Sequence, residues 1–346
     1  MKNQVKFGKW RLMLATMLIA LSFSSCKDGF IYDGEGDCNV YYNISFKYDY
    51  NMKFADAFAK EVNSVALFVF DTNNTLVKSV VVNDESVKGD NFAIPLDLPA
   101  GRYELLAWAG LKNSQSFKLL ADAKVGVTKR QEMQVKMNRE TVNGVAVVDK
   151  DLSSLFHGMM SLDYPSTPGT YNATMSLMKN TNSIRVMLQQ MSDDLVAEKF
   201  RYEITADNGY MDWNNNILED EVITYKPWYV VSGTADVQPD YGTNADHSNG
   251  AVSVAIAEFT LGRMIDGKSP ILTIWNKEEN KKVLSIPIAD YALLVKGYYN
   301  REMNNQEYLD RQDDYTMTFF LDEDGKWLSA SILVNSWRVV LNNNIL

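Results

Sequence analysis

Val65-Ala-Leu-Phe-Val-Phe-Asp-Thr-Asn-Asn74 joins an unbroken apolar run to polar residues that favour turns. Valine and phenylalanine favour strands, and a short apolar run bounded by a turn is typical of a buried β-strand. Beyond the turn, Val77 to Val82 is again rich in valine and has the length of a matching strand. We therefore predict a β-hairpin over residues 65–82 whose first strand is buried.

Strand patterns also dominate the sequence on either side of this hairpin. Residues 40–48 alternate apolar and polar side chains, and residues 103–108 are expected to form a strand after the turn Pro99-Ala-Gly101. Short strands with turns about every ten residues are typical of a β-sandwich. Further strands are expected at Ile184–Leu188, Val252–Ile256, Ile271–Trp275, Val283–Ile288, Tyr315–Leu321 and Trp327–Leu341. Short helices are expected near Phe54–Val62, after Ser192, and at Tyr291–Tyr298.

A break between two strand-rich halves is expected at Asp163-Tyr-Pro-Ser-Thr-Pro-Gly169, which concentrates two prolines and a glycine. The chain has 346 residues, enough for two domains of ~150 residues each after a leader. We predict an N-terminal sandwich over residues 39–165 and a C-terminal sandwich over residues 166–346. The expected fold class is therefore all-β, with two tandem sandwich domains and a few short helices.

The first 38 residues read as an export signal followed by a tether. An apolar stretch from Leu12 to Phe23 leads into Ser24-Ser-Cys26, the order of a lipoprotein signal. We predict a signal peptide over residues 1–25, lipidation of Cys26, and a tether over residues 26–38. The alternative is a plain secretory signal in which Cys26 is incidental. The basic residues that precede the apolar stretch are Lys2, Lys6, Lys9 and Arg11.

Charge and cysteine content narrow the function further. The formal net charge is −10, and removing the basic leader makes the exported part more acidic, so binding to nucleic acid is not expected. Cys26 and Cys38 are the two cysteines of the chain. With lipid on Cys26, no disulfide is available, and Cys38 is expected to be a buried free thiol. No later segment is long and apolar enough to be expected to span a membrane.

Residue counts argue against most enzyme classes. The chain has two histidines, His157 and His247, and we expect the first to be a packing residue and the second a loop residue. No phosphate loop, zinc-peptidase motif or Cys-x-x-Cys pair occurs in the sequence, so we predict no enzyme activity and no cofactor. A glycosidase with two carboxylates is the one class left open.

Acidic turns and tryptophans are the remaining candidates for a binding site. The acidic turns at 207–212, 219–221 and 322–324 do not match the twelve-residue calcium loop, so we expect solvated turns. Trp108, Trp275 and Trp337 lie in apolar strand runs, and we expect them in the core rather than in a sugar-binding groove.

Several motifs in combination carry a family resemblance. In order along the chain they are Asp37-Cys38, Phe46-Lys-Tyr-Asp-Tyr-Asn51, Phe54-Ala-Asp-Ala-Phe58, Val65-Ala-Leu-Phe-Val-Phe-Asp71, Leu98-Pro-Ala-Gly-Arg-Tyr103, Ala107-Trp-Ala-Gly110, Tyr308-Leu-Asp-Arg-Gln312 and Ile332-Leu-Val-Asn-Ser-Trp337. The mature chain resembles the FimB-like anchor and accessory lipoproteins of type V fimbriae from Gram-negative anaerobes. One departure is Ser336, where that family often has glycine.

The resemblance implies a structural role. It implies two transthyretin-like, Greek-key sandwich domains and a lipidated Cys26 in the outer membrane. It also implies that the protein attaches a shaft of fimbrillin subunits to the cell and limits the length of that shaft, without enzyme activity. Lys27-Asp28 after the cysteine resembles the start of a surface-export tag, so we expect exposure at the cell surface.

Assembly is expected to occur by β-strand addition, because an incomplete sandwich leaves backbone groups unpaired along an open edge. The final strand is a candidate for a donated strand or for the last strand of a sheet, and its candidate exchange residues are Ile332, Val334 and Trp337. Two alternative functions stay open. One is a tip or accessory adhesin of the same fimbria, and the other is a surface glycan-binding lipoprotein that recognises host or bacterial ligands.

Overall fold

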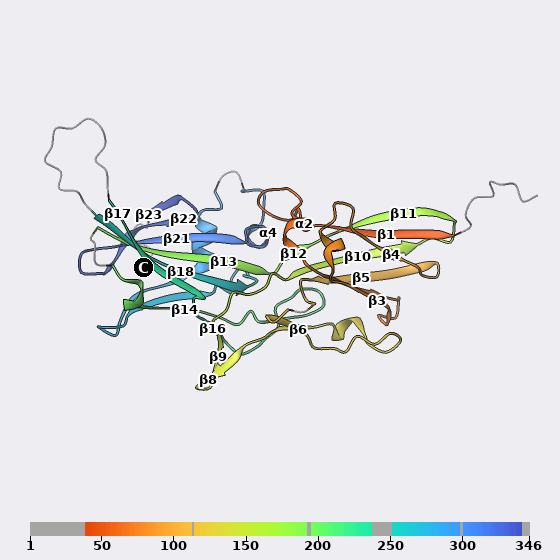
Figure 1. Cartoon of the computed structure of the whole chain (residues 1–346), viewed down its shortest axis with the longest axis horizontal. Coiled ribbons are helices and arrows are strands. Elements are labelled where there is room, and N and C mark those ends of the chain that lie inside the picture. Colours follow the sequence, from red (N-terminus) through yellow and green to blue (C-terminus); the bar gives the residue numbers. More distant parts are fainter. Residues whose placement is uncertain (1–38, 113, 192–194, 237–250, 298–299, 341–346) are drawn as a thin grey trace, which may run out of the picture.

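The computed structural model describes residues 39–112, 114–191, 195–236, 251–297 and 300–340. Strands dominate these residues, and their sheets form sandwiches, which confirms the all-β prediction. The molecule is elongated, with β1, β4 and β11 at one end and β17, β22 and β23 at the other (Figure 1). In the described part of the chain, no helix has the length and apolar character needed to cross a membrane.

A three-stranded sheet and a five-stranded sheet make up the N-terminal sandwich. The smaller sheet has the order β11 (Gly169–Ser176), β1 (Val40–Lys47), β4 (Ala93–Leu96). The larger has the order β12 (Met178–Lys179), β10 (Phe156–Tyr164), β5 (Gly101–Ala109), β2 (Val65–Phe70), β3 (Leu76–Val82). Ile44, Leu67 and Leu105 belong to the apolar core that these two sheets share.

β2 confirms the buried strand predicted from the sequence. Every residue of Val65–Phe70 is buried, and the strand pairs with β3 as the predicted hairpin. Leu67 belongs to the core of the N-terminal sandwich, whereas Phe68 belongs to a second core that also contains Trp108. Because both faces of β2 are covered, the strand reads as a continuous apolar run instead of an alternating one.

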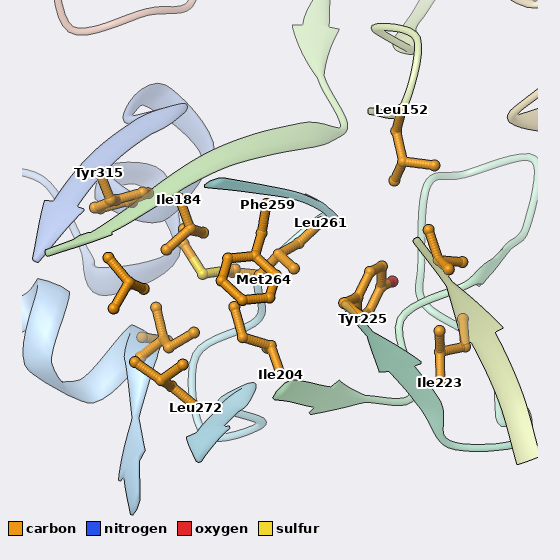
Figure 2. Packing of buried hydrophobic residues seen from close by; sticks show 14 of the residues in the cluster. Leu152, Ile184, Ile204, Ile223, Tyr225, Phe259, Leu261, Met264, Leu272 and Tyr315 are labelled. Carbon is orange, nitrogen blue, oxygen red and sulfur yellow. The ribbon is translucent and has the colours of Figure 1, made fainter. Parts of the chain in front are cut away.

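The C-terminal sandwich consists of two six-stranded sheets. We name them after their central strands. The β13 sheet has the order β17 (Tyr229–Asp236), β18 (Ala251–Gly262), β13 (Thr181–Gln190), β21 (Asp314–Leu321), β22 (Trp327–Val334), β23 (Trp337–Val340). The β14 sheet has the order β20 (Lys281–Pro287), β19 (Ile271–Asn276), β14 (Phe200–Ala206), β16 (Ile223–Tyr225), β9 (Val145–Val148), β8 (Glu140–Val142). Between them lie Ile184, Phe259, Ile204 and Leu272 (Figure 2).

A fifth sheet, which has three strands, lies beside the five-stranded sheet. Its order is β15 (Tyr210–Met211), β7 (Val135–Met137), β6 (Phe117–Leu119). Phe117 and Val135 share one continuous apolar core with Trp108 of β5 and Ile184 of β13. The two sandwiches are therefore joined by packed apolar side chains and not only by the chain that links them.

Strand pairing crosses the expected boundary between residues 165 and 166. β11 lies after that boundary but pairs in parallel with β1, from Val40 opposite Gly169 to Lys47 opposite Ser176. In the other direction, β9 precedes the boundary but pairs with β16. The Pro-Gly turn at 168–169 is thus a connection inside the N-terminal sandwich. We propose that the chain passes from one sandwich to the other between β12 and β13.

The helices are short. They are α2 (Phe58–Glu61), α3 (Ile288–Leu294) and α4 (Asn305–Arg311), with 3-10 turns η1 (Glu85–Lys88), η2 (Arg130–Glu132) and η3 (Ala197–Lys199). The helix predicted from Tyr291 instead begins at Ile288, directly after Pro287, which fits the first positions of a helix. Phe54 lies outside α2 with a φ of 51°. Ser192 and the two residues after it lie outside the described residues.

Candidate strand-exchange edge

The segment predicted as one final strand is a hairpin of β22 and β23. The strands pair with Val334 opposite Trp337, and the two residues between them, Asn335 and Ser336, have φ of 47° and 70°. Positive φ at both central residues is the geometry of a tight hairpin turn. The prediction of a continuous strand to Leu341 is therefore wrong, and Leu341 itself lies outside the described residues.

A sequence signal for this turn existed at Ser336. The family that the chain resembles often has glycine there, and glycine adopts positive φ at little cost. Asn335 is the other residue type that tolerates this region, and it fixes the turn through its own hydrogen bonds. Its side-chain Oδ1 accepts from the backbone amide of Thr316 at 2.8 Å, and its backbone amide donates to the Thr316 carbonyl at 2.9 Å.

The structure separates the three predicted exchange residues. Ile332 and Val334 are 0% exposed and belong to the core of the C-terminal sandwich. Trp337 is 62% exposed, so its expected place in the core is wrong, whereas Trp108 is fully buried as predicted. Trp275 is half-buried under the guanidinium of Arg201, 4.1 Å from the ring centroid. Of the three candidates, Trp337 alone is placed to contact a partner without opening the core.

β23 is an edge strand of the β13 sheet, with no further strand beside it among the described residues. An edge strand presents a row of backbone N–H and C=O groups that another chain can pair with. β23 is four residues long and pairs with Ser331–Val334, so the first half of β22 has no described partner strand on this side. Within the described residues, the edge formed by β23 and the first half of β22 therefore has no partner strand.

An apolar groove lies on the outer face of the sheet beside this edge. It encloses about 470 Å³ between β13, β21 and the β22–β23 hairpin, and Arg338 is the charged side chain among its lining residues. Met191 and Leu328 in its wall are 65% and 47% exposed. Exposed apolar surface next to an open edge is the combination expected where an extended segment of a partner docks. The lining residues are Gln189, Gln190, Met191, Phe320, Leu321, Leu328, Leu333 and Arg338.

A partly buried ionic cluster connects this sheet to the N-terminal sandwich. Lys179 of β12 donates from Nζ to Glu61 of α2 at 2.9 Å and to Asp313, next to β21, at 2.7 Å. Burial alone would lower the pKa of Lys179, but the two carboxylates outweigh it and raise the pKa. Tyr48 at the end of β1 also donates to Asp313, at 3.3 Å. These contacts link α2 and the end of β1 to the residue that precedes β21.

His157 is a packing residue, as predicted. Its side chain is 8% exposed, Nε2 lies 3.0 Å from the Trp213 carbonyl, and its ring contacts that of Trp108 edge-on at 4.8 Å. Burial lowers the pKa of His157 to about 4, so the ring is neutral at neutral pH. His247 lies outside the described residues.

Carboxylates in the acidic turns accept hydrogen bonds from nearby backbone amides. Asp212 Oδ1 accepts from the amides of Asn214 and Asn216, both at 2.8 Å, and Asp322 Oδ1 accepts from the Lys326 amide at 2.7 Å. Asp220 corrects the expectation of a solvated turn, because its side chain is 8% exposed and paired with Arg139. Within the described ranges, no three His, Cys, Asp or Glu side chains gather where they could hold a metal ion.

The predicted lipidation site lies outside the part of the chain that the structure describes. Cys26 and Cys38 both lie outside the described residues, so lipid attachment at Cys26 and the state of the Cys38 thiol stay predictions. The first described residue, Asn39, leads directly into β1 at the end of the molecule away from β23 (Figure 1).

A family model and several solved structures are similar to this chain over most of its length. The model of fimbrillin-A associated anchor proteins Mfa1 and Mfa2 matches residues 35–343. A candidate adhesin from Bacteroides thetaiotaomicron VPI-5482 is 33% identical, with a TM-score of 0.75 over 89% of this chain and 100% of that one. A candidate polysaccharide-binding protein from the same organism is 28% identical, with a TM-score of 0.74 over 88% and 99%. No curated protein sequence matches the chain.

A more distant structure extends the likeness in fold. The fimbrial anchor protein Mfa2 from Porphyromonas gingivalis is 14% identical, with a TM-score of 0.63 over 88% of this chain and 100% of that one. At this identity the likeness is one of fold alone.

Proposed function

Because the chain belongs to the family of fimbrillin-A associated anchor proteins Mfa1 and Mfa2, we propose that it is a fimbrial subunit held in the outer membrane by lipid on Cys26. Its partner is a fimbrillin shaft subunit, which it attaches to the cell surface and whose filament length it limits. The leader sequence before Cys26 supports the lipid anchor, and the family supports the fimbrial partner.

The observation that carries this proposal is the separation of the two attachment points. The described chain begins next to β1 at one end of an elongated molecule, and the open edge at β23 lies in the sandwich at the other end (Figure 1). A lipid-bearing tether at the first end leaves the edge facing away from the membrane. That arrangement suits a subunit that links a membrane to a filament.

The contact with the shaft is strand addition at the β22–β23 hairpin. The hairpin acts as acceptor rather than donor, because Ile332 and Val334 are buried in the core and donating β22 would expose them. An extended segment of the shaft subunit pairs beside β23 and contacts Trp337. Backbone hydrogen bonds then supply affinity, and the apolar groove lined by Leu328 and Leu333 selects the side chains of the incoming segment.

Length control follows from the same contact. An anchor that pairs with one shaft subunit occupies the segment through which a further shaft subunit would join. Filaments on cells that lack the anchor are then expected to be longer and to be released into the medium.

Immunogold electron microscopy tests the proposal on cells that make the wild-type chain, Cys26→Ala or the matched control Cys38→Ala. We expect gold at filament bases in the wild type and the control, and shed filaments with Cys26→Ala. Gold at filament tips would instead assign the chain as an accessory adhesin. Gold spread over the membrane away from filaments would contradict both fimbrial functions.

A further inference from the structure

A cavity of about 760 Å³ opens at the end of the N-terminal sandwich, far from the β22–β23 edge. It lies where β1 begins, between the turn that follows β4 and the turn that follows β10. Its volume falls within the range of sites that hold small ligands. The lining residues are Asn39, Val40, Tyr41, Tyr42, Asn43, Lys78, Pro95, Leu96, Asp97, Leu98, Ala100, Tyr164, Pro165 and Ser166.

The aromatic part of this cavity is fixed before any ligand enters. The Tyr42 ring lies 5.5 Å from that of Tyr164 and is stacked 5.9 Å from that of Tyr171. Tyr164 is held in turn by its hydroxyl, which donates to the Leu96 carbonyl at 3.1 Å. Tyr41 also lines the cavity, from the other face of β1 than Tyr42, and is 48% exposed. Rings already held in place lose little conformational freedom when a ligand stacks on them.

One positively charged and one negatively charged side chain line the cavity. Lys78 and Asp97 are the charged side chains among the residues that line it, and Lys78 Nζ donates to the Asp97 backbone carbonyl at 3.2 Å. Asp97 itself is exposed, in the stretch that joins β4 to β5. At the rim, the side-chain Nδ2 of Asn43 donates to Oδ1 of Asn172 at 3.2 Å. A single cation beside a carboxylate does not suit a phosphate or another strong anion.

We propose that this cavity binds a neutral saccharide, with Tyr41 stacking on the apolar face of a sugar ring and Asp97 accepting hydrogen bonds from its hydroxyls. A sugar ring has one C–H face and a polar rim, which matches an aromatic surface bordered by carboxylate and amide groups. A hydrocarbon chain would offer the Asp97 carboxylate no hydrogen-bond donor. This site is separate from strand addition at β23, and neither depends on the other.

Two sources supply such saccharides at a cell surface. One is the polysaccharide of the cell that makes the protein, and the other is the glycan of a host surface or mucus. Residue 39 borders the cavity and follows Cys26 by 13 residues, a reach of at most ~45 Å when extended. A lipid-anchored chain therefore holds the cavity close to its own membrane, which favours the cell's own polysaccharide.

Saturation-transfer NMR and titration calorimetry test the proposal on the full chain in detergent. The probes are neutral polysaccharide extracted from the producing cells and neutral glycans released from host mucin. We expect the first to bind, and Tyr41→Ala and Asp97→Ala each to raise Kd about tenfold. Tyr229→Ala is the matched control, since Tyr229 is 47% exposed on the other sandwich and is expected to leave Kd unchanged.

The outcomes separate cleanly. Binding of the mucin glycans alone, with the same dependence on Tyr41, keeps the site but assigns it to host surfaces. Absence of binding by both probes overturns the proposal, as does binding that neither Tyr41→Ala nor Asp97→Ala weakens. Filament attachment is expected to stay intact in both variants, so failure here leaves the proposed anchor function untouched.

Discussion

Arg263 and Asp310 form a two-pronged ion pair, with Nε 2.7 Å from Oδ1 and Nη2 2.7 Å from Oδ2. Their side chains are 13% and 6% exposed, and Arg263 also donates from Nη1 to the Asn215 carbonyl at 2.6 Å. Asp310 lies in α4, four residues before β21 begins. The pair therefore fixes the start of the strand against which the β22–β23 hairpin is built.

Asp310→Ala is expected to reduce the free energy of unfolding by about 3–5 kcal/mol, because it leaves the Arg263 guanidinium buried without its counter-charge. Urea denaturation followed by circular dichroism measures the loss. Asp163→Ala is the control, since its pair with Arg102 is 70% and 79% exposed and is expected to contribute less than about 1 kcal/mol. Equal losses in the two variants would rule out a structural role for the buried pair.

His157 makes the protein less stable as the pH falls from about 6.5 to about 4. In this window the unfolded chain takes up a proton at His157, while the folded chain, whose pKa is about 4, does not. Protonation then favours the unfolded state, with a loss of about 3 kcal/mol across the window. We expect midpoints of urea denaturation to fall steadily with pH in the wild type.

His157→Gln is the control for that prediction, because glutamine does not titrate. Its stability is expected to be lower at pH 7 but flatter between pH 6.5 and 4. Below that range a further loss begins in both proteins: burial tends to raise the pKa of Asp220, but hydrogen bonds from Arg139 and Lys136 lower it overall. Parallel pH profiles for the two proteins would show that His157 does not titrate as expected.

Phe54→Asn is expected to stabilise the protein by ~0.5–1 kcal/mol. Phe54 has a φ of 51°, a region that is costly for a bulky side chain and tolerated by asparagine. The ring is 61% exposed, so its removal costs little apolar burial beyond a contact with the Arg311 guanidinium 5.3 Å from its centroid. Phe54→Ala keeps the Cβ and the strain, and is expected not to stabilise. Thermal unfolding distinguishes the two variants.

Local sequence patterns predicted the strands whose environment is uniform along their length. β2 is buried on both faces, so its apolar run identified it, and the turn residues after it identified β3 as its partner. The parallel pairing of β1 with β11 has no such signal, because the two strands lie far apart in the sequence and share no turn. Local patterns therefore gave no sign that strand pairing crosses the expected boundary at 165/166.

The sequence predicted the strand-exchange edge at β22–β23 only in part. Ile332 and Val334 belong to the apolar run Ile332-Leu-Val334, which is typical of a strand, and the structure places both in the core. Trp337 continues the apolar pattern, yet the left-handed pair Asn335 and Ser336 reverses the chain before it. Apolar periodicity does not report such a reversal; the turn-forming residue types do.

Trp337→Ala is expected to release filaments from cells without unfolding the protein. Its ring is 62% exposed on the edge strand, so truncation removes contact area for an incoming strand while the core residues Ile332 and Val334 stay in place. We expect the free energy of unfolding to change by less than about 1 kcal/mol and the fraction of shed filaments to rise several-fold. Trp228→Ala is the matched control, because Trp228 is 39% exposed beside β17, the opposite edge of the same sheet. Quantitative immunoblots of shed and cell-bound fimbriae give the readout, and equal shedding by the two variants would exclude β23 as the edge that accepts the shaft.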